Sequence, residues 1–557
     1  MEMQNPRIMI AASASGTGKT IFSCALMSLL KKQGKKVRGF KCGPDYIDPM
    51  FHRKLAGVDC ENLDPFFMEG ERMRRILAEA GEGISILEGV MGLYDGIPGG
   101  GGSCYEVACA TATPILLLMN AMGTGQTVLS SLKGILFDDR EHRIAGVVFC
   151  YMSRSFFEEI RQEAERVIRD CHSEAVLLGS IQKSNKIHLE SRHLGLFLPD
   201  EISDLKEQIC HFSTLIEEGI DLSRLEEIME QAETLPTPVL PALKRRKMIR
   251  LAVARDEAFS FYYHDNIRLL EECGAEIVRF SPLHDRELPE GISGLLLGGG
   301  YPELYARALS DNASMRESIR MAIAGGMPSL AECGGFMYLH EILEDLKGRA
   351  YSMVGAIPGR AYYNGHLTRF GYITIEEKGE HPDSFFYKSS MRGHSFHYYE
   401  STNAGEDCMA KKPHSDRSWT CMHVGGVHLW GFAHLYYPSD PETIRRFVDK
   451  MKDYAADNRK NLQSHSEEPV QNLPASFRFF ENKDCEYYPC HKGVRRINCL
   501  FCYCPLYWEM DCPGHPRFKE KEGVRIKICT DCTYPHDPDH YEAITGRIRK
   551  LFSLQNR

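Results

Sequence analysis

Short apolar runs alternate with helix-like stretches along most of this chain, and this alternation is the feature that most constrains its fold. The runs in the first part include Ile8–Ile10, Ile84–Leu87, Pro114–Leu118 and Ile144–Phe149. Continuous apolar strands separated by helices are typical of a parallel sheet that helices cover on both faces. The pattern therefore predicts an α/β fold.

The length of 557 residues predicts several domains, because single hydrophobic cores rarely grow beyond about 250–300 residues. A proline-bearing and then basic stretch separates two α/β regions, and a polar segment precedes a cysteine-rich end. We predict an α/β domain over 1–235, a linker over 236–248, a second α/β domain over 249–454, a flexible linker over 455–476 and a cysteine-rich domain over 477–557.

Charge and hydropathy exclude some classes of partner. The net charge of −9 argues against nucleic acid as the main ligand. No apolar run is long enough to cross a bilayer, and the N-terminal residues lead into a strand rather than a signal peptide. We expect a cytoplasmic protein with reduced thiols and with neither nucleic acid nor membrane as a partner.

A glycine-containing loop follows the first apolar run and precedes a helix-like segment over Ile21–Lys32. Its spacing fits the phosphate-binding pattern G-x-x-x-x-G-K-[ST], except that Ser13 replaces the first glycine. Backbone N–H groups of such a loop converge on phosphate oxygens, a lysine neutralises charge, and a hydroxyl binds Mg²⁺. We predict that ATP binds Ser15, Gly16, Thr17, Gly18, Lys19 and Thr20.

Carboxylates follow the next strand-like segments. Asp45 and Asp48 lie in a turn with Tyr46, and Glu88 ends an apolar run, where ligands bind in open α/β sheets. Mg²⁺ prefers hard oxygen ligands, so Asp45 and Glu88 join Thr20 as predicted magnesium ligands. Tyr46 and Asp48 suit substrate positioning, although Asp48 could equally serve only to form the turn.

Cys333 has the sequence context of a nucleophile. It follows the apolar Leu330–Ala331 and precedes Gly334, Gly335 and a helix-like segment. A thiol there is expected to be exposed near a helix N-terminus, where the dipole favours the thiolate and neighbouring N–H groups can hold an oxyanion. The alternative is a buried structural cysteine.

A cysteine nucleophile needs a base and an oxyanion hole. His434 follows a short apolar strand and is the preferred base, with His397 second and His394 a further competitor. Glycines that follow the strand Gly294–Leu297 free N–H groups to point into a site. We therefore predict that the oxyanion hole forms near Gly299 and Gly334.

Taken together, these motifs resemble the cobyrinic acid a,c-diamide synthase family over about residues 7–440. The motifs that carry the resemblance are Ser13–Thr20, Gly43–Pro49, Glu88–Gly92, Arg192–Leu196, Ala252–Phe259, Gly298–Leu304, Ala331–Leu339 and Gly393–His397. The resemblance implies a dethiobiotin synthetase-like phosphate-loop domain and a class I glutamine amidotransferase-like domain.

The resemblance also implies a ligase of cobalamin biosynthesis. It would amidate the a and c carboxylates of cobyrinate through acyl phosphates, using ATP, Mg²⁺ and ammonia that Cys333 and His434 release from glutamine. It places Tyr46, Asp48, Arg192 and His193 near the substrate. A homodimer and contacts with other enzymes of that pathway are further expectations.

Two features depart from the relatives' patterns. Many class I amidotransferases carry Glu two positions after the histidine, where this chain has Tyr436. The sequence before His434 is Gly431-Phe432-Ala433 rather than the family's Ser-Tyr-x. The residue that orients His434 is therefore absent or supplied from elsewhere, as in a Cys–His dyad.

The tail is dense in cysteine. Eight of the twenty cysteines are Cys485, Cys490, Cys499, Cys502, Cys504, Cys512, Cys529 and Cys532. In a reducing compartment this density predicts metal binding rather than disulfides, with two thiolate sites or one site plus reactive thiols. Zn²⁺ and an iron–sulfur cluster fit equally well, and a disulfide-stapled module is the alternative.

Other functions fit parts of the sequence. The same motifs would serve amidation of hydrogenobyrinate or nickel sirohydrochlorin. A non-catalytic ATP- and metal-binding regulator is a different class, and intact Lys19, Thr20 and Cys333 argue against it.

Overall fold

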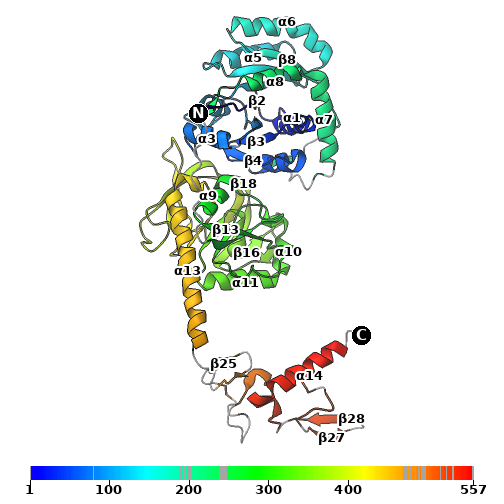
Figure 1. The fold of residues 1–557 in the computed structure, drawn as a ribbon, viewed down its shortest axis with the longest axis vertical. Coiled ribbons are helices and arrows are strands. Elements are labelled where there is room, and N and C mark those ends of the chain that lie inside the picture. The colour runs from blue at the N-terminus through cyan, green and yellow to red at the C-terminus, as the bar shows by residue number, and fades with distance from the viewer. Residues whose placement is uncertain are drawn as a thin grey trace. The chain divides into compact units, whose positions relative to one another are not determined.

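The computed structural model divides the chain into two compact units, Met1–Asp457 and Asn458–Arg557. It describes residues 2–79, 81–187, 191–192, 195–196, 202, 204–236, 248–467, 475–476, 479–482, 485–486, 490, 497–507, 509–514, 516–521, 524–529 and 532–554. The first unit contains two α/β lobes, and the second contains the cysteine-rich tail (Figure 1).

The N-terminal lobe contains a parallel sheet of order β4-β3-β5-β2-β6-β7-β8. Its strands are β2 (Arg7–Ala12), β3 (Val37–Cys42), β4 (Cys60–Leu63), β5 (Ile84–Glu88), β6 (Ile115–Asn120), β7 (Ile144–Cys150) and β8 (Val176–Ile181). Every residue of β2 is buried. A strand buried on both faces reads as one continuous apolar run, so the sequence pattern and the structure agree.

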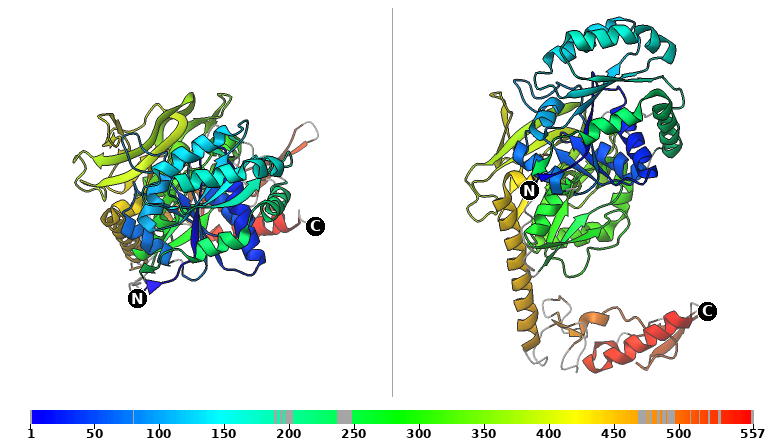
Figure 2. Two further views of the ribbon diagram at one scale, coloured as in Figure 1. Left: turned by 90° about the horizontal axis from the view of Figure 1, so that it is seen from above. Right: turned by 45° about the horizontal axis from the view of Figure 1, so that its top comes forward.

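Helices cover both faces of this sheet (Figures 1 and 2). One apolar core contains side chains of α3 (Gly70–Glu79), α4 (Cys104–Thr111), α5 (Thr127–Asp138) and α6 (Arg154–Asp170). The other contains side chains of α1 (Lys19–Lys32), α2 (Ile47–Phe51), α7 (Leu205–Gly219) and α8 (Leu222–Glu230). Two short pairings complete the lobe: β1 (Glu2–Met3) with β11 (Leu235–Pro236), and β9 (Ser191–Arg192) with β10 (Gly195–Leu196).

The second lobe begins with β12, and its first sheet has the order β13-β12-β14-β15-β23-β22. The strands are β12 (Ile249–Ala254), β13 (Ala275–Phe280), β14 (Gly294–Leu297), β15 (Ser329–Glu332), β22 (His423–Val424) and β23 (His428–Gly431). The helices on its faces are α9 (His264–Glu272), α10 (Ala306–Asp311), α11 (Ala313–Ala324), α12 (Gly334–Leu339) and α13 (Pro441–Glu467).

A largely antiparallel second sheet is formed mainly by the segment between β15 and β23. Its last strand, β24, follows β23, whereas β22 of the same segment belongs to the first sheet. The path of the second sheet is β17-β16-β18-β19-β24, with β20 and β21 beside β18. The strands are β16 (His340–Glu344), β17 (Ala350–Ser352), β18 (Ile357–Glu377), β19 (Ser390–Ser401), β20 (Cys408–Lys411), β21 (Ser418–Cys421) and β24 (His434–Leu435).

Helix α13 extends to Glu467 and so continues into the segment predicted to be a flexible linker. In the second unit, β25 (Ala475–Ser476) pairs with β26 (Phe479–Phe480), β27 (Arg517–Lys521) pairs with β28 (Val524–Ile528), and α14 spans Tyr541–Leu554. No helix among the described residues is long and apolar enough to span a membrane.

Candidate active site

The phosphate loop leads from β2 into α1. Gly16 and Gly18 adopt φ of +75° and +95°, a region that costs glycine little. Gly18 is the residue before the first turn of α1, so the loop's N–H groups converge where a phosphate would bind. Ser13, which replaces a glycine of the motif, accepts a hydrogen bond at Oγ from the backbone N–H of Asn120 (3.0 Å). The hydroxyl thus fastens the loop to the end of β6.

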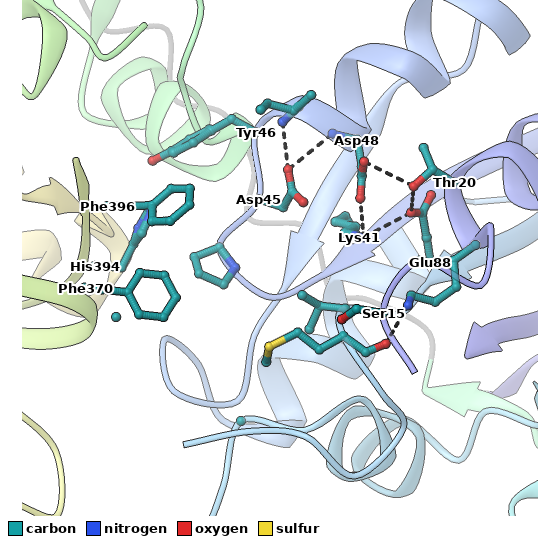
Figure 3. A pocket seen from close by; sticks show the side chains of 18 of the residues that line it. Ser15, Thr20, Lys41, Asp45, Tyr46, Asp48, Glu88, Phe370, His394 and Phe396 are labelled. Carbon is teal, nitrogen blue, oxygen red and sulfur yellow. Dashed lines mark hydrogen bonds and ion pairs between the residues drawn. The ribbon is translucent and has the colours of Figure 1, made fainter. Parts of the chain in front are cut away.

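Thr20 lies against two carboxylates at the C-terminal edge of the sheet (Figure 3). Its hydroxyl donates to Glu88 Oε1 (2.7 Å) and approaches Asp48 Oδ1 (3.2 Å). Asp45 has another role, because its Oδ1 accepts from the N–H groups of Ile47 (2.8 Å) and Asp48 (3.2 Å). The structure therefore brings Asp48, rather than Asp45, against Thr20 and Glu88.

The sequence interpretation missed two side chains that contact these acids. Lys41 Nζ lies 2.5 Å from Asp48 Oδ2 and 3.0 Å from Glu88 Oε1, and His52 Nε2 lies 2.6 Å from Glu88 Oε2. Although burial opposes ionisation, Lys41 and His52 lower the pKa of Glu88. Burial and the neighbouring Asp45 raise the pKa of Asp48. The position of Lys41 near the end of β3 was the only sequence signal for its role.

The structure describes some of the residues predicted to contact the substrate and not others. Tyr46 lies in an aromatic cluster, with its ring stacked on Phe261 (5.1 Å between centroids, 3°) and 4.5 Å from that of Tyr263. Both partners belong to the second lobe, so Tyr46 joins the two lobes. The backbone of Arg192 lies in β9, but its side chain and all of His193 lie outside the described residues.

Cys333 lies at a tight turn between β15 and α12. Its φ of +45° and ψ of −103° place a non-glycine residue in a sparsely populated region, a form of strain that concentrates at functional sites. The expectation of an exposed, thiolate-favouring cysteine was wrong. The side chain is only 7% exposed, and burial together with Glu303 raises the pKa of the thiol.

His434 begins β24 and is paired with His394 of the neighbouring strand β19. The two imidazoles stack, with 4.9 Å between ring centroids and an interplanar angle of 18°. The centroid of the Tyr46 ring lies 5.2 Å from that of His434. Burial, with His394 and His397 nearby, lowers the pKa of His434, so the ring is neutral. His397 instead donates a hydrogen bond from Nδ1 to the backbone carbonyl oxygen of Tyr399 (2.6 Å).

The predicted oxyanion glycines lie beside these residues. A Cβ on Gly299 would lie 2.4 Å from Cε1 of His434, and one on Gly334 would lie 3.0 Å from the backbone nitrogen of Gly300. Neither position can take a side chain without a shift of its neighbours. The close approach brings backbone N–H groups from two loops next to the cysteine and the histidine, as an oxyanion hole requires.

The Tyr436 side chain, two positions after His434, points to the other lobe. Its hydroxyl donates to Asp265 and accepts from Arg72 Nε (3.3 Å), and its ring stacks on Phe67 (4.9 Å, 7°). Arg72 and Phe67 belong to the N-terminal lobe. Glu332 supports the same segment, since its carboxylate accepts from the Tyr437 side chain and the Leu435 backbone. Its position directly before Cys333 was the only signal for this role in the sequence.

One cavity joins the two sets of residues. It has a volume of about 1420 Å³, and its lining includes Gly18, Lys19, Tyr46, Cys333 and His434. Pockets for drug-sized ligands are typically about 300–1000 Å³. The phosphate loop and the cysteine–histidine pair therefore face a shared space with room for more than one ligand.

The tail gathers its thiols into two groups. Cys504, Cys512, Cys529 and Cys532 line one cavity of about 410 Å³ together with Cys502. Burial and the thiols of Cys512, Cys529 and Cys532 raise the pKa of Cys504. Burial and the thiols of Cys485, Cys499 and Cys502 raise the pKa of Cys490. Among the described residues, Glu380, His381 and Asp407 are the one set of three possible metal ligands whose ligand atoms all lie within 4.8 Å of one another. No three sulfurs of the described tail residues lie that close together, so the tail thiols are farther apart than the ligands of a bound metal.

Comparisons with known proteins fit this geometry. Residues 8–197 match a CobQ/CobB/MinD/ParA nucleotide binding domain, 250–427 a CobB/CobQ-like glutamine amidotransferase domain, and 476–557 a cysteine-rich small domain. The cobyrinate a,c-diamide synthase of Dehalococcoides mccartyi is 34% identical over 475 residues, covering 81% of this chain and 99% of that protein. The chain belongs to the cobyrinate a,c-diamide synthase family.

Other members of the family match over the same extent. The cobyrinate a,c-diamide synthase of Listeria innocua is 36% identical, covering 79% of this chain and 98% of its own. That of Priestia megaterium is 32% identical, covering 81% and 98%. The family assignment confirms the predicted pairing of a phosphate-loop domain with a glutamine amidotransferase domain.

Proposed function

We propose that this chain converts the a and c carboxylates of cobyrinic acid to amides, with ATP as the energy source and glutamine as the nitrogen donor. The observation that carries the proposal is the single cavity that contains both the phosphate loop and the Cys333–His434 pair. A carboxylate must first be activated, because hydroxide or oxide is a poor leaving group. The nitrogen must then reach the activated group before water does.

The N-terminal lobe supports the activation step. The loop N–H groups and Lys19 would bind the ATP phosphates, and the substrate carboxylate oxygen would attack the γ-phosphorus to give an acyl phosphate and ADP. The hydroxyl of Thr20 and the carboxylates of Glu88 and Asp48 offer hard oxygens for Mg²⁺, which would supply charge neutralisation on the phosphates when bound. The ion pairs of Lys41 keep Glu88 and Asp48 in place at the edge of the sheet.

The second lobe supports ammonia release. The raised pKa of Cys333 and the lowered pKa of His434 mean that thiol and imidazole both rest neutral. Cys333 would attack the amide carbon of glutamine while His434 takes the thiol proton and passes it to the leaving nitrogen. N–H groups near Gly299 and Gly334 would hold the oxyanion. The products are ammonia and a thioester, which water hydrolyses to glutamate.

The shared cavity lets ammonia reach the acyl phosphate directly. Its nitrogen would attack the acyl carbon, forming the amide and releasing phosphate. The free state of all twenty cysteines suits a reducing cytoplasm, where we place the reaction.

We propose that the tail binds metal through two groups of four thiolates. The first group is Cys485, Cys490, Cys499 and Cys502, and the second is Cys504, Cys512, Cys529 and Cys532. The thiols that act on Cys490 belong to the first group and those that act on Cys504 to the second, which supports this division. Four thiolates suit Zn²⁺ or an iron–sulfur cluster. Metal analysis and the visible spectrum of anaerobically purified full-length protein distinguish the two. Two zinc ions per chain are expected, and no bound metal would refute the assignment.

The catalytic proposal is tested with purified full-length protein, ATP, Mg²⁺ and glutamine. Cobyrinate, hydrogenobyrinate and nickel sirohydrochlorin are supplied separately, and the products are weighed by mass spectrometry. A gain of two amides on cobyrinate is expected. Cys333→Ser should lose the glutamine-dependent product and keep the product formed with ammonium salt. Failure to amidate any of the three macrocycles would refute the proposal and favour a regulator.

A further inference from the structure

Part of the shared cavity is lined by the inserted sheet of the second lobe. The residues are Phe370, Gly371, Tyr372, Phe396, Lys412 and Arg417, from β18, β19 and the loop between β20 and β21. None of them has been given a role in the two half-reactions. Their chemistry is two-sided, with aromatic rings next to cationic groups.

The aromatic side consists of Phe370 and Phe396. Phe370 is 56% exposed although it lines a cavity, and its ring lies 5.2 Å from that of Phe396 (Figure 3). The pairing of β18 with β19 shifts register between Thr368 and Gly371, and Gly371 has φ of +100°. Such an irregularity re-aims side chains next to active sites. A large apolar ring left open to solvent in a cavity suits contact with an apolar ligand face.

The cationic side consists of Lys412 and Arg417. Lys412 Nζ donates to the backbone carbonyl oxygen of Phe370, so the ammonium is held next to the exposed ring. Burial and the neighbouring Arg417 lower the pKa of Lys412 to about 8. The loop between them also reaches the N-terminal lobe, since a Cβ on Gly99 would lie 2.9 Å from Cβ of His414.

The other lysines of the cavity have assigned partners or distant positions. Lys41 pairs with Asp48 and Glu88, and Lys19 belongs to the phosphate loop. The acids Asp48 and Glu88 lie in the nucleotide half. Lys183, the remaining lysine that lines the cavity, belongs to the N-terminal lobe. On the second lobe, a large planar ligand with several carboxylates would therefore meet favourable charge at Lys412 and Arg417, while its flat face meets the phenyl rings.

We propose that the second lobe forms half of the tetrapyrrole site. Phe370 and Phe396 pack against a face of the macrocycle, and Lys412 and Arg417 bind peripheral carboxylates that do not react in that turnover. The inference rests on the proposed function, because it assigns where the macrocycle lies. It makes the second lobe a substrate-binding element as well as the source of ammonia.

The test measures binding of cobyrinate to the full-length protein by equilibrium dialysis, with the absorbance of the corrin as readout. Lys412→Met and Phe370→Ala should each weaken binding about tenfold, because a charge-assisted contact and a large apolar contact are lost. Lys412→Met should also flatten the dependence of binding on salt. Lys412→Arg should keep most of the affinity.

Matched controls are available on the same surface and elsewhere. Lys411→Met removes the neighbouring lysine, which pairs with Glu376 at 2.5 Å and does not line the cavity. Phe137→Ala removes a phenylalanine that is 79% exposed on α5. Both should bind cobyrinate as wild type does. ATP affinity and the glutaminase rate of the Lys412 and Phe370 variants should be unchanged, which excludes misfolding.

The outcomes separate the two proposals. Amide formation with unchanged cobyrinate binding by Lys412→Met and Phe370→Ala would overturn the assignment of the macrocycle site and leave the proposed function standing. Absence of both binding and amidation in wild type would overturn the two together.

Discussion

The ring of Tyr46, from the phosphate-loop lobe, lies 5.2 Å from the imidazole of His434 in the amidotransferase lobe. Tyr46 immediately follows Asp45 and precedes the helix that carries Asp48. One residue thus touches the proposed base of ammonia release and belongs to the loop that organises the phosphate site. The two half-reactions are joined by direct packing.

Tyr46→Ala should uncouple the two reactions. Loss of the ring removes the stack on Phe261 and opens the cavity next to His434, so ammonia should escape to solvent. We expect the ratio of glutamate to amide product to rise severalfold above one, with glutaminase activity retained. Both products can be measured by mass spectrometry. Tyr46→Phe keeps the ring and is the control, and an unchanged ratio in Tyr46→Ala would contradict the coupling.

Arg72→Ala should weaken the contact between the lobes. Arg72 Nη2 lies 3.0 Å from Asp265 Oδ2, and removal of one partner leaves a buried carboxylate less well paired. Arg268 also pairs with Asp265, and Arg72 is partly exposed, so the loss should be roughly 1–2 kcal/mol rather than the larger cost of an isolated buried charge.

Denaturant unfolding measures this loss, and glutaminase activity should fall with it because Tyr436 lies two positions after His434. Arg75→Ala is the matched control, since Arg75 lies on the same helix and pairs with Glu79 within its own lobe. Equal effects of the two substitutions would show that the interlobe contact has no special role.

Glu332 should make stability depend on pH. Burial raises the pKa of Glu332 to about 8, above its ordinary value, so the folded state holds a proton that the unfolded state releases. The folded state is therefore favoured below pH 4.5, and this contribution is lost as pH rises towards 8. Glu332→Gln mimics the protonated acid and should remove this slope.

The measurement is the free energy of unfolding of wild type and Glu332→Gln between pH 5 and pH 8.5. The difference between the two proteins should change by on the order of 2–4 kcal/mol in favour of the variant as pH rises. A difference that stays constant over this range would show that Glu332 ionises normally in the folded protein.

Cys333 should react slowly with alkylating agents in the free enzyme. Burial raises the pKa of the thiol, so little thiolate is present near neutral pH. Labelling with iodoacetamide at pH 8, followed by peptide mass spectrometry, should modify Cys333 more slowly than the exposed Cys210. Rapid labelling of Cys333 that is already complete at pH 6 would instead indicate a resting thiolate–imidazolium pair.

The strand pattern and the phosphate loop were predictable because both depend on local sequence. Apolar runs specify buried strands, and the glycines before Lys19 specify a turn that few other residues adopt. The turn at Cys333 and the tightly packed Gly299 and Gly334 also lie in short segments with a recognisable local sequence. The predicted apolar strands and the loop before Lys19 are present in the structure.

The environment of each site depended on contacts between distant segments, which a sequence pattern does not contain. Cys333 is buried by the packing of the whole lobe, and Glu303, thirty positions earlier, acts on its thiol. The contact of Tyr46 with His434 requires two lobes to dock. Phe370 and Lys412 belong to segments of the second lobe that contain none of the motifs found in the sequence. The helix over residues 455–467 was mistaken for a linker because its polar residues are typical of both.

We expect ammonia to pass from Cys333 to the acyl phosphate through one protein cavity. The most direct test supplies full-length protein with ATP, cobyrinate, glutamine labelled with ¹⁵N in its amide, and excess unlabelled ammonium, and then weighs the product. Direct transfer predicts an amide that carries mainly ¹⁵N. An amide whose isotope ratio equals that of the bulk ammonium would contradict the claim.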